Sequence, residues 1–110
     1  MASASGFFGV PKLSVYAASK SYLINLLRAV NEEFSGTQIR FVALCPFFVV
    51  TPMIATKKTS FFYISPERLV KSFVSSSWSS TVCNPSFGHK LQYVVLRLLP
   101  ERMRMRKLNC

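Results

Sequence analysis

Two residues capable of acid–base chemistry stand one helical turn apart near the start of this chain. Tyr16 and Lys20 are four positions apart, and Ser3 lies 13 positions before the tyrosine. On a helix, side chains at positions i and i+4 share a face, so the lysine ammonium can lie beside the tyrosine phenol. A neighbouring cation favours the phenolate and makes the tyrosine a usable proton donor or acceptor close to neutral pH. A serine hydroxyl nearby could hydrogen-bond the oxygen whose charge changes during reaction.

The spacing of Tyr16 and Lys20 has low specificity by itself, because short motifs match many sequences by chance. An exposed helix on which the tyrosine packs and the lysine is solvated would explain the pair equally well. The surrounding elements favour the catalytic interpretation, and in chain order they are Ser3-Ala-Ser-Gly6, Pro11, Tyr16-Ala-Ala-Ser-Lys20, a long helical pattern, and Arg40-Phe-Val-Ala-Leu-Cys-Pro-Phe-Phe-Val-Val-Thr-Pro52. This order resembles the C-terminal half of a short-chain dehydrogenase/reductase, a family in which the serine, tyrosine and lysine at these spacings are catalytic.

Further features resemble the microsomal branch of that family, which contains the very-long-chain 3-oxoacyl-CoA reductases and related 17-beta-hydroxysteroid dehydrogenases. Phe47 follows Pro46 at a place where most members have glycine. The long helical pattern ends in Glu32-Glu33-Phe34, and Ser65-Pro-Glu-Arg-Leu-Val-Lys-Ser72 follows further on. The branch resemblance implies an NADP(H)-dependent oxidoreductase of fatty acid elongation or steroid metabolism. Its substrate would be a 3-oxoacyl-CoA or a steroid ketone, and its location the cytosolic side of the endoplasmic reticulum membrane.

The first half of the chain reads as a strand, a helix and a second strand. Residues 1–12 read as the stub of a strand followed by a loop, because glycine and proline interrupt any regular element there. Ser14 is the expected N-cap of a helix over residues 15–34, in which apolar residues recur at helical spacing and which Gly36 ends. Residues 39–44 form a short apolar run typical of a buried parallel strand.

The second half of the chain carries weaker patterns. A serine, proline and acid at residues 65–67 predict the start of a helix that continues to about residue 77. Residues 87–98 fit either a last strand or an apolar helix. The resemblance places a substrate loop near residues 57–63, although packing of its aromatic side chains onto the next helix is an equal alternative. The end of the chain is expected to be an electrostatic tail without regular structure, and its basic residues are Arg102, Arg104, Arg106 and Lys107.

The resemblance implies an α/β fold, namely the C-terminal part of a Rossmann-type doubly wound parallel sheet, incomplete in this chain. Residues 1–99 would form the C-terminal half of a short-chain dehydrogenase domain, and residues 100–110 the basic tail. Ligands of open α/β sheets bind at the carboxyl ends of the strands, which here is the stretch from Pro46 to Thr51. A parallel sheet is normally covered on both faces, so we expect the isolated chain to be poorly soluble or only partly folded.

Each candidate site residue takes its expected role from the family. Tyr16 would pass a proton to the substrate carbonyl oxygen, Lys20 would ease that transfer and hydrogen-bond the nicotinamide ribose, and Ser3 would orient and polarise the carbonyl. Val49 and Thr51 match the positions that contact the nicotinamide carboxamide. Three apolar residues could line an acyl or steroid pocket, with core packing as an equal alternative for each: Phe47, Phe48 and Met53.

The usual means of holding a dinucleotide is missing from these residues. None of the four glycines lies in a glycine-rich turn after a strand, and no acidic or basic selector follows a second strand. The family's upstream catalytic asparagine is also absent. We therefore expect no turnover by this chain alone. Three hypotheses remain open: the catalytic half of an NADP(H)-dependent reductase, a non-enzymatic remnant that interacts through a basic, apolar surface, and a basic peptide that binds membrane surfaces.

Composition and charge limit the other classes of protein. Half of the 110 residues are hydrophobic and 16% are charged, which indicates a globular chain. The formal net charge of +10 suits anionic partners such as phosphates, acyl-CoA or lipid headgroups, and no nucleic-acid-binding module accompanies it. The three cysteines lack the spacing of a metal site, so no metal is expected, and Cys45 reads as a core residue.

Targeting and assembly signals are sparse. The start lacks a basic region followed by an apolar core, and the longest apolar run, residues 41–55, is too short and too interrupted for a membrane span. Membrane association would come from sequence absent here or from the basic tail. The resemblance also allows a homo-oligomer through the helix that carries Tyr16 and Lys20. His89, the single histidine, is expected to have no catalytic role.

Overall fold

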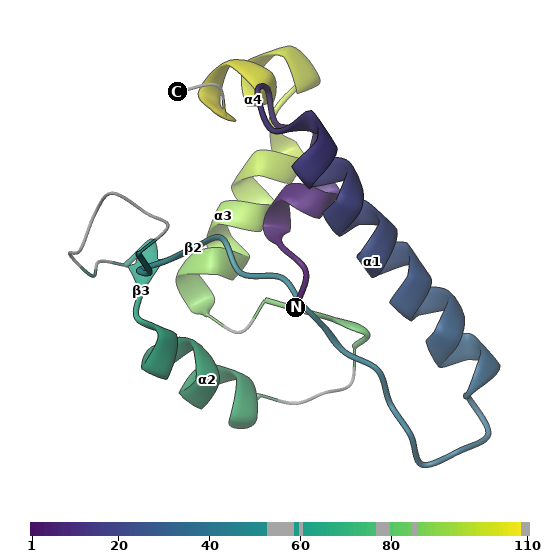
Figure 1. The fold of residues 1–110 in the computed structure, drawn as a ribbon. Coiled ribbons are helices and arrows are strands. Elements are labelled where there is room, and N and C mark those ends of the chain that lie inside the picture. The colour runs from purple at the N-terminus through teal and green to yellow at the C-terminus, as the bar shows by residue number, and fades with distance from the viewer. Residues whose placement is uncertain (53–58, 60, 77–79, 85, 109–110) are drawn as a thin grey trace.

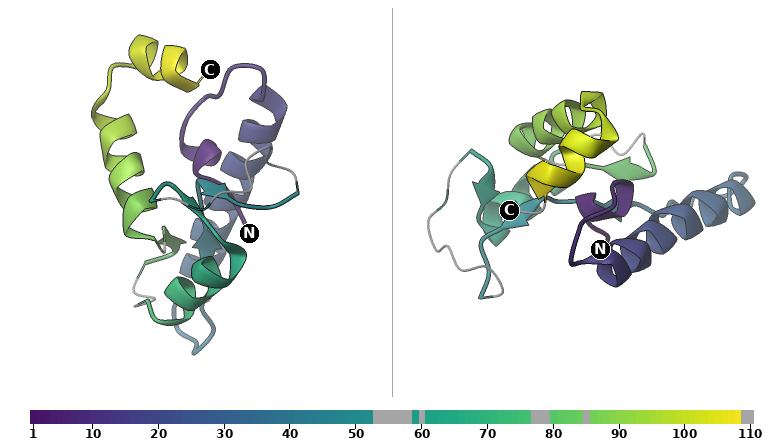
Figure 2. Two further views of the ribbon diagram at one scale, coloured as in Figure 1. Left: turned by 90° about the vertical axis from the view of Figure 1, so that its left-hand side faces the viewer. Right: turned by 90° about the horizontal axis from the view of Figure 1, so that it is seen from above.

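The computed structural model describes residues 1–52, 59, 61–76, 80–84 and 86–108. In Figure 1, α1 runs along one side, α2 lies on the opposite side, and η1, a single 3₁₀ turn, lies between α1 and α3. Figure 2 shows the same arrangement from two further directions. The helices are η1 (Ala4–Phe7), α1 (Ser14–Glu33), α2 (Pro66–Val74), α3 (Phe87–Leu98) and α4 (Glu101–Leu108). The strands are β1 (Ala43–Leu44), β2 (Phe48–Val49), β3 (Tyr63–Ile64) and β4 (Val82–Cys83).

The strands form two short parallel pairs. β1 pairs with β4 in the register Ala43↔Val82, and β2 pairs with β3 in the register Phe48↔Tyr63. The extended N-terminal residues lie along β1, because the Ala2 N–H donates to the Leu44 carbonyl at 2.9 Å and the Ala4 N–H to the Pro46 carbonyl at 3.0 Å. The predicted strand stub at the N-terminus therefore pairs as a parallel strand would, although its regular pattern stops where η1 begins.

The core lies between α1 and the β1–β4 pair. Its fully enclosed members come from the N-terminus, from α1 and from β1 with the residue that follows it, and half-buried apolar side chains pack around them. The prediction that Cys45 is a core residue is confirmed, because its exposed fraction is 0%. The buried members are Ala2, Ile24, Ala43 and Cys45, and the surrounding ones are Phe7, Leu23, Leu27 and Val82.

The helix predicted over residues 15–34 is confirmed to within one residue at each end. The prediction that Ser14 is its N-cap is wrong. The Ala17 N–H already bonds to the Leu13 carbonyl at 2.8 Å, so Leu13 is the cap residue and Ser14 lies in the first turn. At the other end the Phe34 N–H bonds to the Val30 carbonyl, and Gly36 lies in the following turn without adopting a left-handed conformation.

The strand predicted over residues 39–44 is much shorter than expected, because only Ala43 and Leu44 belong to β1. The backbone before it is held by a side chain instead. Asn31, in the last turns of α1, accepts a hydrogen bond from the Phe41 N–H at 2.8 Å and donates to the Phe41 carbonyl. Its amide also donates to Thr81 Oγ1 at 3.0 Å. An amide side chain thus satisfies the Phe41 backbone in place of a neighbouring strand.

The helix start predicted at residues 65–67 is confirmed. Ser65 accepts a hydrogen bond from the Arg68 N–H at 3.3 Å, Pro66 occupies the first turn, and Glu67 follows it. α2 ends at Val74, short of the predicted residue 77, which lies outside the described residues. Among the two options for residues 87–98, the structure has the helix, α3.

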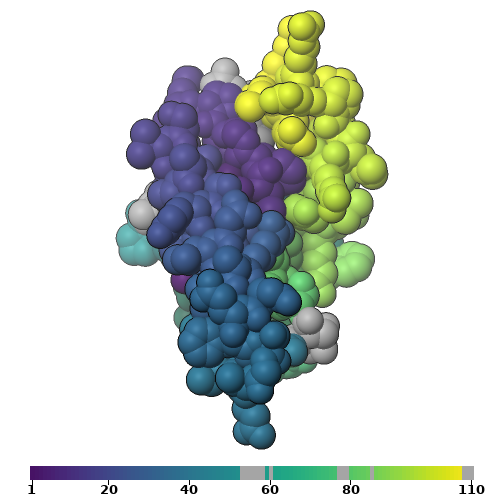
Figure 3. Space-filling view, turned by 90° about the vertical axis from the view of Figure 1, so that its right-hand side faces the viewer, coloured from purple at the N-terminus to yellow at the C-terminus, as the bar shows by residue number. Residues whose placement is uncertain are grey.

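The prediction that the basic end lacks regular structure is wrong. Residues 101–108 form α4, and the Arg104 N–H bonds to the Pro100 carbonyl at 3.0 Å. The helix packs back onto the N-terminal part of the chain, because the Arg104 guanidinium lies 5.0 Å from the centroid of the Phe8 ring. Figure 3 shows α4 beside the start of α1 on one face of the molecule. In the part of the chain that the structure describes, no helix is both long and apolar enough to cross a membrane.

Candidate active site

Ser3 lies at the point where the extended N-terminus turns into η1. Its two neighbours, Ala2 and Ala4, both donate backbone hydrogen bonds to the segment that ends β1. The half-buried Ser3 side chain caps η1, since Oγ accepts from the Ser5 N–H at 3.3 Å and from the Ser5 hydroxyl at 3.0 Å. The hydroxyl is therefore held beside the carboxyl end of β1, where a parallel sheet binds its ligands.

Tyr16 and Lys20 occupy the first two turns of α1 on one face, as their spacing predicts. The Lys20 Nζ lies 5.2 Å from the centroid of the Tyr16 ring, a cation–π distance. The tyrosine is 43% exposed, and the lysine is half-buried. The structure thus brings the two side chains together at an accessible position. Their catalytic role stays a prediction.

Gly6 joins the two parts of the candidate site. A Cβ at this position would lie 2.7 Å from Ile24 Cδ1 and 2.8 Å from the Lys20 carbonyl carbon. Such distances are too short for any other residue, so η1 can approach the backbone of α1 this closely only with glycine. The segment that begins at Ser3 is consequently packed against the helix that carries Tyr16 and Lys20.

The stretch from Pro46 to Thr51 leaves the carboxyl end of β1 and forms β2. Pro46 is buried, and Val49 and Thr51 are half-buried. Val49 is in register with Ile64 of β3, and the Val50 N–H donates to the Ile64 carbonyl at 2.8 Å. Backbone pairing with β3 therefore fixes the segment in which the two expected carboxamide contacts lie. Whether they contact a cofactor stays a prediction.

The two phenylalanines expected in a substrate pocket each have an aromatic neighbour. The Phe47 ring lies 5.8 Å from the His89 imidazole, and the Phe48 ring stacks on Tyr63 at 5.0 Å and 22°. Phe48 is nevertheless 43% exposed, so part of this side chain remains accessible. Both packing and pocket lining remain open for these side chains. Met53, the third expected pocket residue, lies outside the described residues.

Two residues near the site make contacts that the sequence does not predict. Ser5 supplies both hydrogen bonds to Ser3, and a serine two positions away is the only sequence signal for that cap. His89 is fully buried and contacts the Phe47 N–H through Nδ1 at 3.4 Å. Burial lowers the pKa of His89 below its ordinary value, and backbone hydrogen bonds with Phe62 and, to a smaller extent, Phe48 partly oppose that effect. No spacing in the sequence links residues 42 positions apart.

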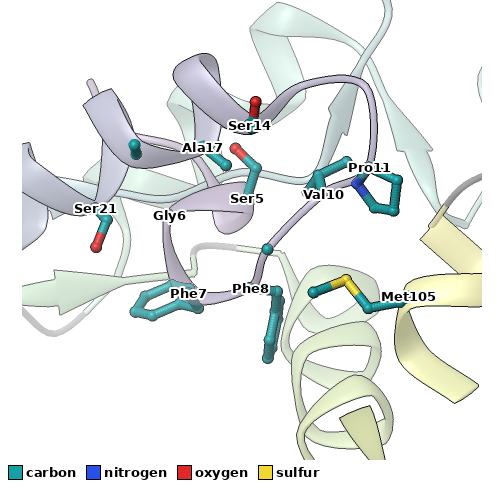
Figure 4. Close-up of a pocket in the computed structure, with 12 residues that line it drawn as sticks. Ser5, Gly6, Phe7, Phe8, Val10, Pro11, Ser14, Ala17, Ser21 and Met105 are labelled. Carbon is teal, nitrogen blue, oxygen red and sulfur yellow. The ribbon is translucent and has the colours of Figure 1, made fainter. Parts of the chain in front are cut away.

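A cavity of about 510 Å³ opens near the start of α1. Figure 4 shows Ser5 and Ser14 across it from Met105 of α4. The α1 residues that line it come from another side of the helix than Tyr16 and Lys20, since a helix turns once in about 3.6 residues. None of the predicted site residues that the structure describes lines this cavity. Its lining residues are Ser5, Gly6, Phe7, Phe8, Gly9, Val10, Pro11, Ser14, Ala17, Ala18, Ser21 and Met105.

Comparison with known proteins identifies the family. The sequence pattern described as short chain dehydrogenase matches residues 1–60, which include Ser3, the Tyr16–Lys20 pair and the Pro46–Thr51 segment. The chain belongs to the short-chain dehydrogenase family. The short strand pairs are parallel, as expected of a fragment of the Rossmann-type sheet of that family.

Curated relatives match almost the whole chain. Very-long-chain 3-oxoacyl-CoA reductase-B of Danio rerio is 30% identical over 104 residues, which are 94% of this chain and 33% of the relative. Putative steroid dehydrogenase 2 of Caenorhabditis elegans is 32% identical over 98 residues, 86% of this chain and 31% of the relative. Hydroxysteroid dehydrogenase-like protein 1 of Gallus gallus is 31% identical over 105 residues, 92% of this chain and 32% of the relative. The chain thus spans about a third of the length of these relatives, and no solved structure matches it.

Proposed function

We propose that this chain carries the catalytic half of an NADP(H)-dependent oxidoreductase that reduces a 3-oxoacyl-CoA or a steroid ketone. The observation that supports the proposal is the meeting of three segments at the carboxyl end of β1. Ser3 is held there by the backbone bonds of its neighbours, and Gly6 packs the same turn onto α1 beside Lys20. The Pro46–Thr51 segment begins at the same end of the strand.

The chain's own residues would act on the proton and the carbonyl. Tyr16 would give its phenolic proton to the substrate oxygen, and its exposure leaves the ring open to a ligand. Lys20, with its ammonium over that ring, would stabilise the phenolate that remains. Ser3 Oγ serves as an acceptor in both of its bonds to Ser5, so its own hydrogen would be free to polarise the substrate carbonyl.

The residues present fit the nicotinamide end of a dinucleotide. Lys20 is half-buried and its ammonium lies over an aromatic ring, which leaves donor hydrogens for ribose hydroxyls. The backbone of Val49 and the hydroxyl of Thr51 would hold the carboxamide. When bound, the reduced nicotinamide supplies the hydride. NADP rather than NAD is proposed from the likeness to the 3-oxoacyl-CoA reductases and steroid dehydrogenases.

The substrate class is proposed from the names of the relatives, which are reductases of very-long-chain 3-oxoacyl-CoA and steroid dehydrogenases. An acyl chain or a steroid needs an apolar surface. Phe47 and Phe48 would provide it at the mouth of the site, because Phe48 remains partly exposed over Tyr63. Action at the cytosolic side of the endoplasmic reticulum membrane is proposed from the resemblance to the microsomal branch of the family.

A second copy of the chain is proposed as a partner of α1. Three apolar side chains of this helix are exposed at positions i, i+7 and i+11, which share one face. Val15 is 82% exposed, Tyr22 64% and Leu26 40%. An antiparallel copy of the same helix would cover such a stripe in a two-fold symmetric interface.

The alternative function, a non-enzymatic remnant, is supported by the surface of α3 and α4. The inward face of α3 is already packed, yet its outward face exposes five large apolar side chains: Phe87, Leu91, Val94, Val95 and Leu98. Residues 87–108 contain six lysines and arginines and one acid. An apolar stripe beside basic side chains suits the surface of an anionic membrane.

The decisive experiment measures NADPH binding and reduction of a 3-oxoacyl-CoA by the purified chain, with Tyr16→Phe as the test variant. Tyr22→Phe is the matched control, because it removes a hydroxyl from an exposed tyrosine of the same helix. Turnover that Tyr16→Phe abolishes and Tyr22→Phe preserves would exclude the remnant. We expect no turnover from the 110 residues alone. The transcript sequence immediately upstream of the Met1 codon then distinguishes the reductase from the remnant. The reductase predicts a glycine-rich turn after a strand there, and unrelated sequence would refute it.

A further inference from the structure

His89 is a fully buried histidine that the proposed chemistry does not use. Both of its ring nitrogens have backbone partners: the Phe47 N–H lies 3.4 Å from Nδ1, and the Phe62 carbonyl oxygen lies 3.3 Å from Nε2. A backbone N–H can only donate, so the Phe47 contact makes Nδ1 an acceptor and leaves the ring proton on Nε2, where it donates to Phe62. The backbone of Phe48 also lies near the ring and, like that of Phe62, opposes the lowering of its pKa. The Phe47 and Phe62 contacts therefore fit one neutral tautomer.

The two backbone partners belong to segments that are otherwise weakly joined. Phe47 directly precedes β2, and Phe62 directly precedes β3. These strands have two residues each, so only a few backbone hydrogen bonds connect them. The imidazole, fixed on the first turn of α3, adds a connection from each segment to a third element. It reaches 42 positions back to Phe47 and 27 positions back to Phe62.

The first turn of α3 packs closely against the segment before β3. Gly88 is buried, and a Cβ there would collide with the Phe61 carbonyl oxygen. Ser86, just before the helix, is 8% exposed. The Phe47 ring lies against the imidazole at 5.8 Å and 54°. Glycine at position 88 lets the start of α3 approach the Phe61 backbone, and His89 can then bond to Phe47 and Phe62. The placement of α3 therefore depends on both residues.

We propose that His89 is a positioning residue that holds the Phe47–Val49 backbone against the segment before β3. The inference rests on the proposed function in so far as that backbone carries the expected cofactor and substrate contacts. The side chain required here must accept at one atom and donate at another. A glutamine amide can do both, whereas leucine can do neither and a doubly protonated imidazole would present an N–H to the Phe47 N–H.

The experiment compares His89→Gln, His89→Leu and Tyr93→Leu with the unaltered chain. Tyr93→Leu is the matched control, because it removes a ring of the same helix that packs on Phe7 at 5.0 Å and on Phe8 at 5.8 Å. Nitrogen-15 NMR is expected to show His89 Nε2 protonated and Nδ1 unprotonated. Amide hydrogen exchange at Phe47 is expected to be about tenfold faster in His89→Leu, the loss of roughly one hydrogen bond, and to be largely restored in His89→Gln.

The outcomes separate the positioning role from the proposed function. A proton on Nδ1, or the same acceleration at Phe47 in Tyr93→Leu as in His89→Leu, would overturn the positioning role. NADPH titration of the same variants reports on the function. If exchange changes as expected and NADPH binding weakens in His89→Leu but recovers in His89→Gln, both stand. If exchange changes as expected and no variant binds NADPH, the positioning role stands and cofactor binding by this chain fails.

Discussion

At the residue scale, exposure divides four ionisable side chains into an accessible pair and a buried pair. Tyr16 is 43% exposed and Lys20 is half-buried, so a ligand can reach both. Cys45 and His89 are 0% exposed, and substrate can reach neither in this structure. A general acid must come within hydrogen-bond reach of the reacting atom. The accessible pair therefore suits the proposed chemistry, whereas the buried pair suits structural support.

The thiol of Cys45 should be nearly inert in the folded chain. Burial, with a smaller contribution from Cys83, raises its pKa from 9.0 to about 12, although Arg28 and the N-terminal amine oppose the rise. Only the thiolate attacks alkylating agents, so in a Cys110→Ser variant Cys45 should react with iodoacetamide at least about a hundredfold more slowly than the half-buried Cys83 at pH 8. Mass spectrometry of the alkylated peptides measures both rates, which should become similar in urea. Equal rates in the native chain would contradict the buried placement.

His89 should make the stability of the chain depend on pH. Burial lowers its pKa below 6.5 in the folded state, so the unfolded chain binds more protons between that lowered value and about 6.5. The free energy of unfolding should therefore be highest above about pH 6.5 and fall as the pH drops through this window. Urea unfolding at pH 7.5 and pH 5.5 measures the change. His89→Gln should show a smaller fall, because His89 is the single histidine, and an equal fall would assign the effect to other groups.

At the scale of elements, the contact of η1 with α1 packs the turn that follows Ser3 against the helix that carries Tyr16 and Lys20. Gly6→Ala would place a methyl group 2.8 Å from the Lys20 carbonyl carbon, and backbone cannot move aside cheaply. We expect it to destabilise the chain by about 1–3 kcal/mol. Gly36→Ala is the control, since nothing lies within 4 Å of its Cβ position and no glycine has a positive φ. That change should be neutral or stabilise by up to about 1 kcal/mol, as urea unfolding would measure. Equal effects would mean that η1 does not pack on α1 in solution.

The elements also show what the sequence could and could not predict. The bounds of α1 and the start of α2 follow from local patterns, namely apolar spacing and the Ser65 cap. The shortness of β1 does not, because the Phe41 backbone is satisfied by the side chain of Asn31. The helix α4 was not predicted, because a run of basic residues indicates a solvated tail. In the structure Arg104 packs on the Phe8 ring instead. The His89 contacts depend on long-range folding and have no local signal.

At the scale of the whole molecule, the two exposed apolar faces differ in the charges beside them. The α1 face of Val15, Tyr22 and Leu26 belongs to a helix with both basic and acidic residues. The α3 face continues into α4, whose charged side chains other than Glu101 are basic. Mixed charge suits a second protein copy, whereas one sign of charge suits an anionic surface. The two faces should therefore serve different partners.

The α3 face should bind lipid vesicles through both apolar and electrostatic contacts. In sedimentation with vesicles that contain phosphatidylserine, the chain should pellet at low salt and be released progressively as sodium chloride rises, because added ions screen the basic side chains. The double variant Val94→Ser/Leu98→Ser removes two exposed apolar groups, 49% and 79% exposed, and should weaken binding about tenfold or more. The matched variant Val15→Ser/Leu26→Ser alters the α1 face, 82% and 40% exposed, and should leave vesicle binding unchanged. Equal loss in both variants would indicate non-specific adsorption of apolar surface. Binding that persists at high salt and on neutral phosphatidylcholine vesicles would contradict a contribution from the basic residues, because only apolar contacts could explain it.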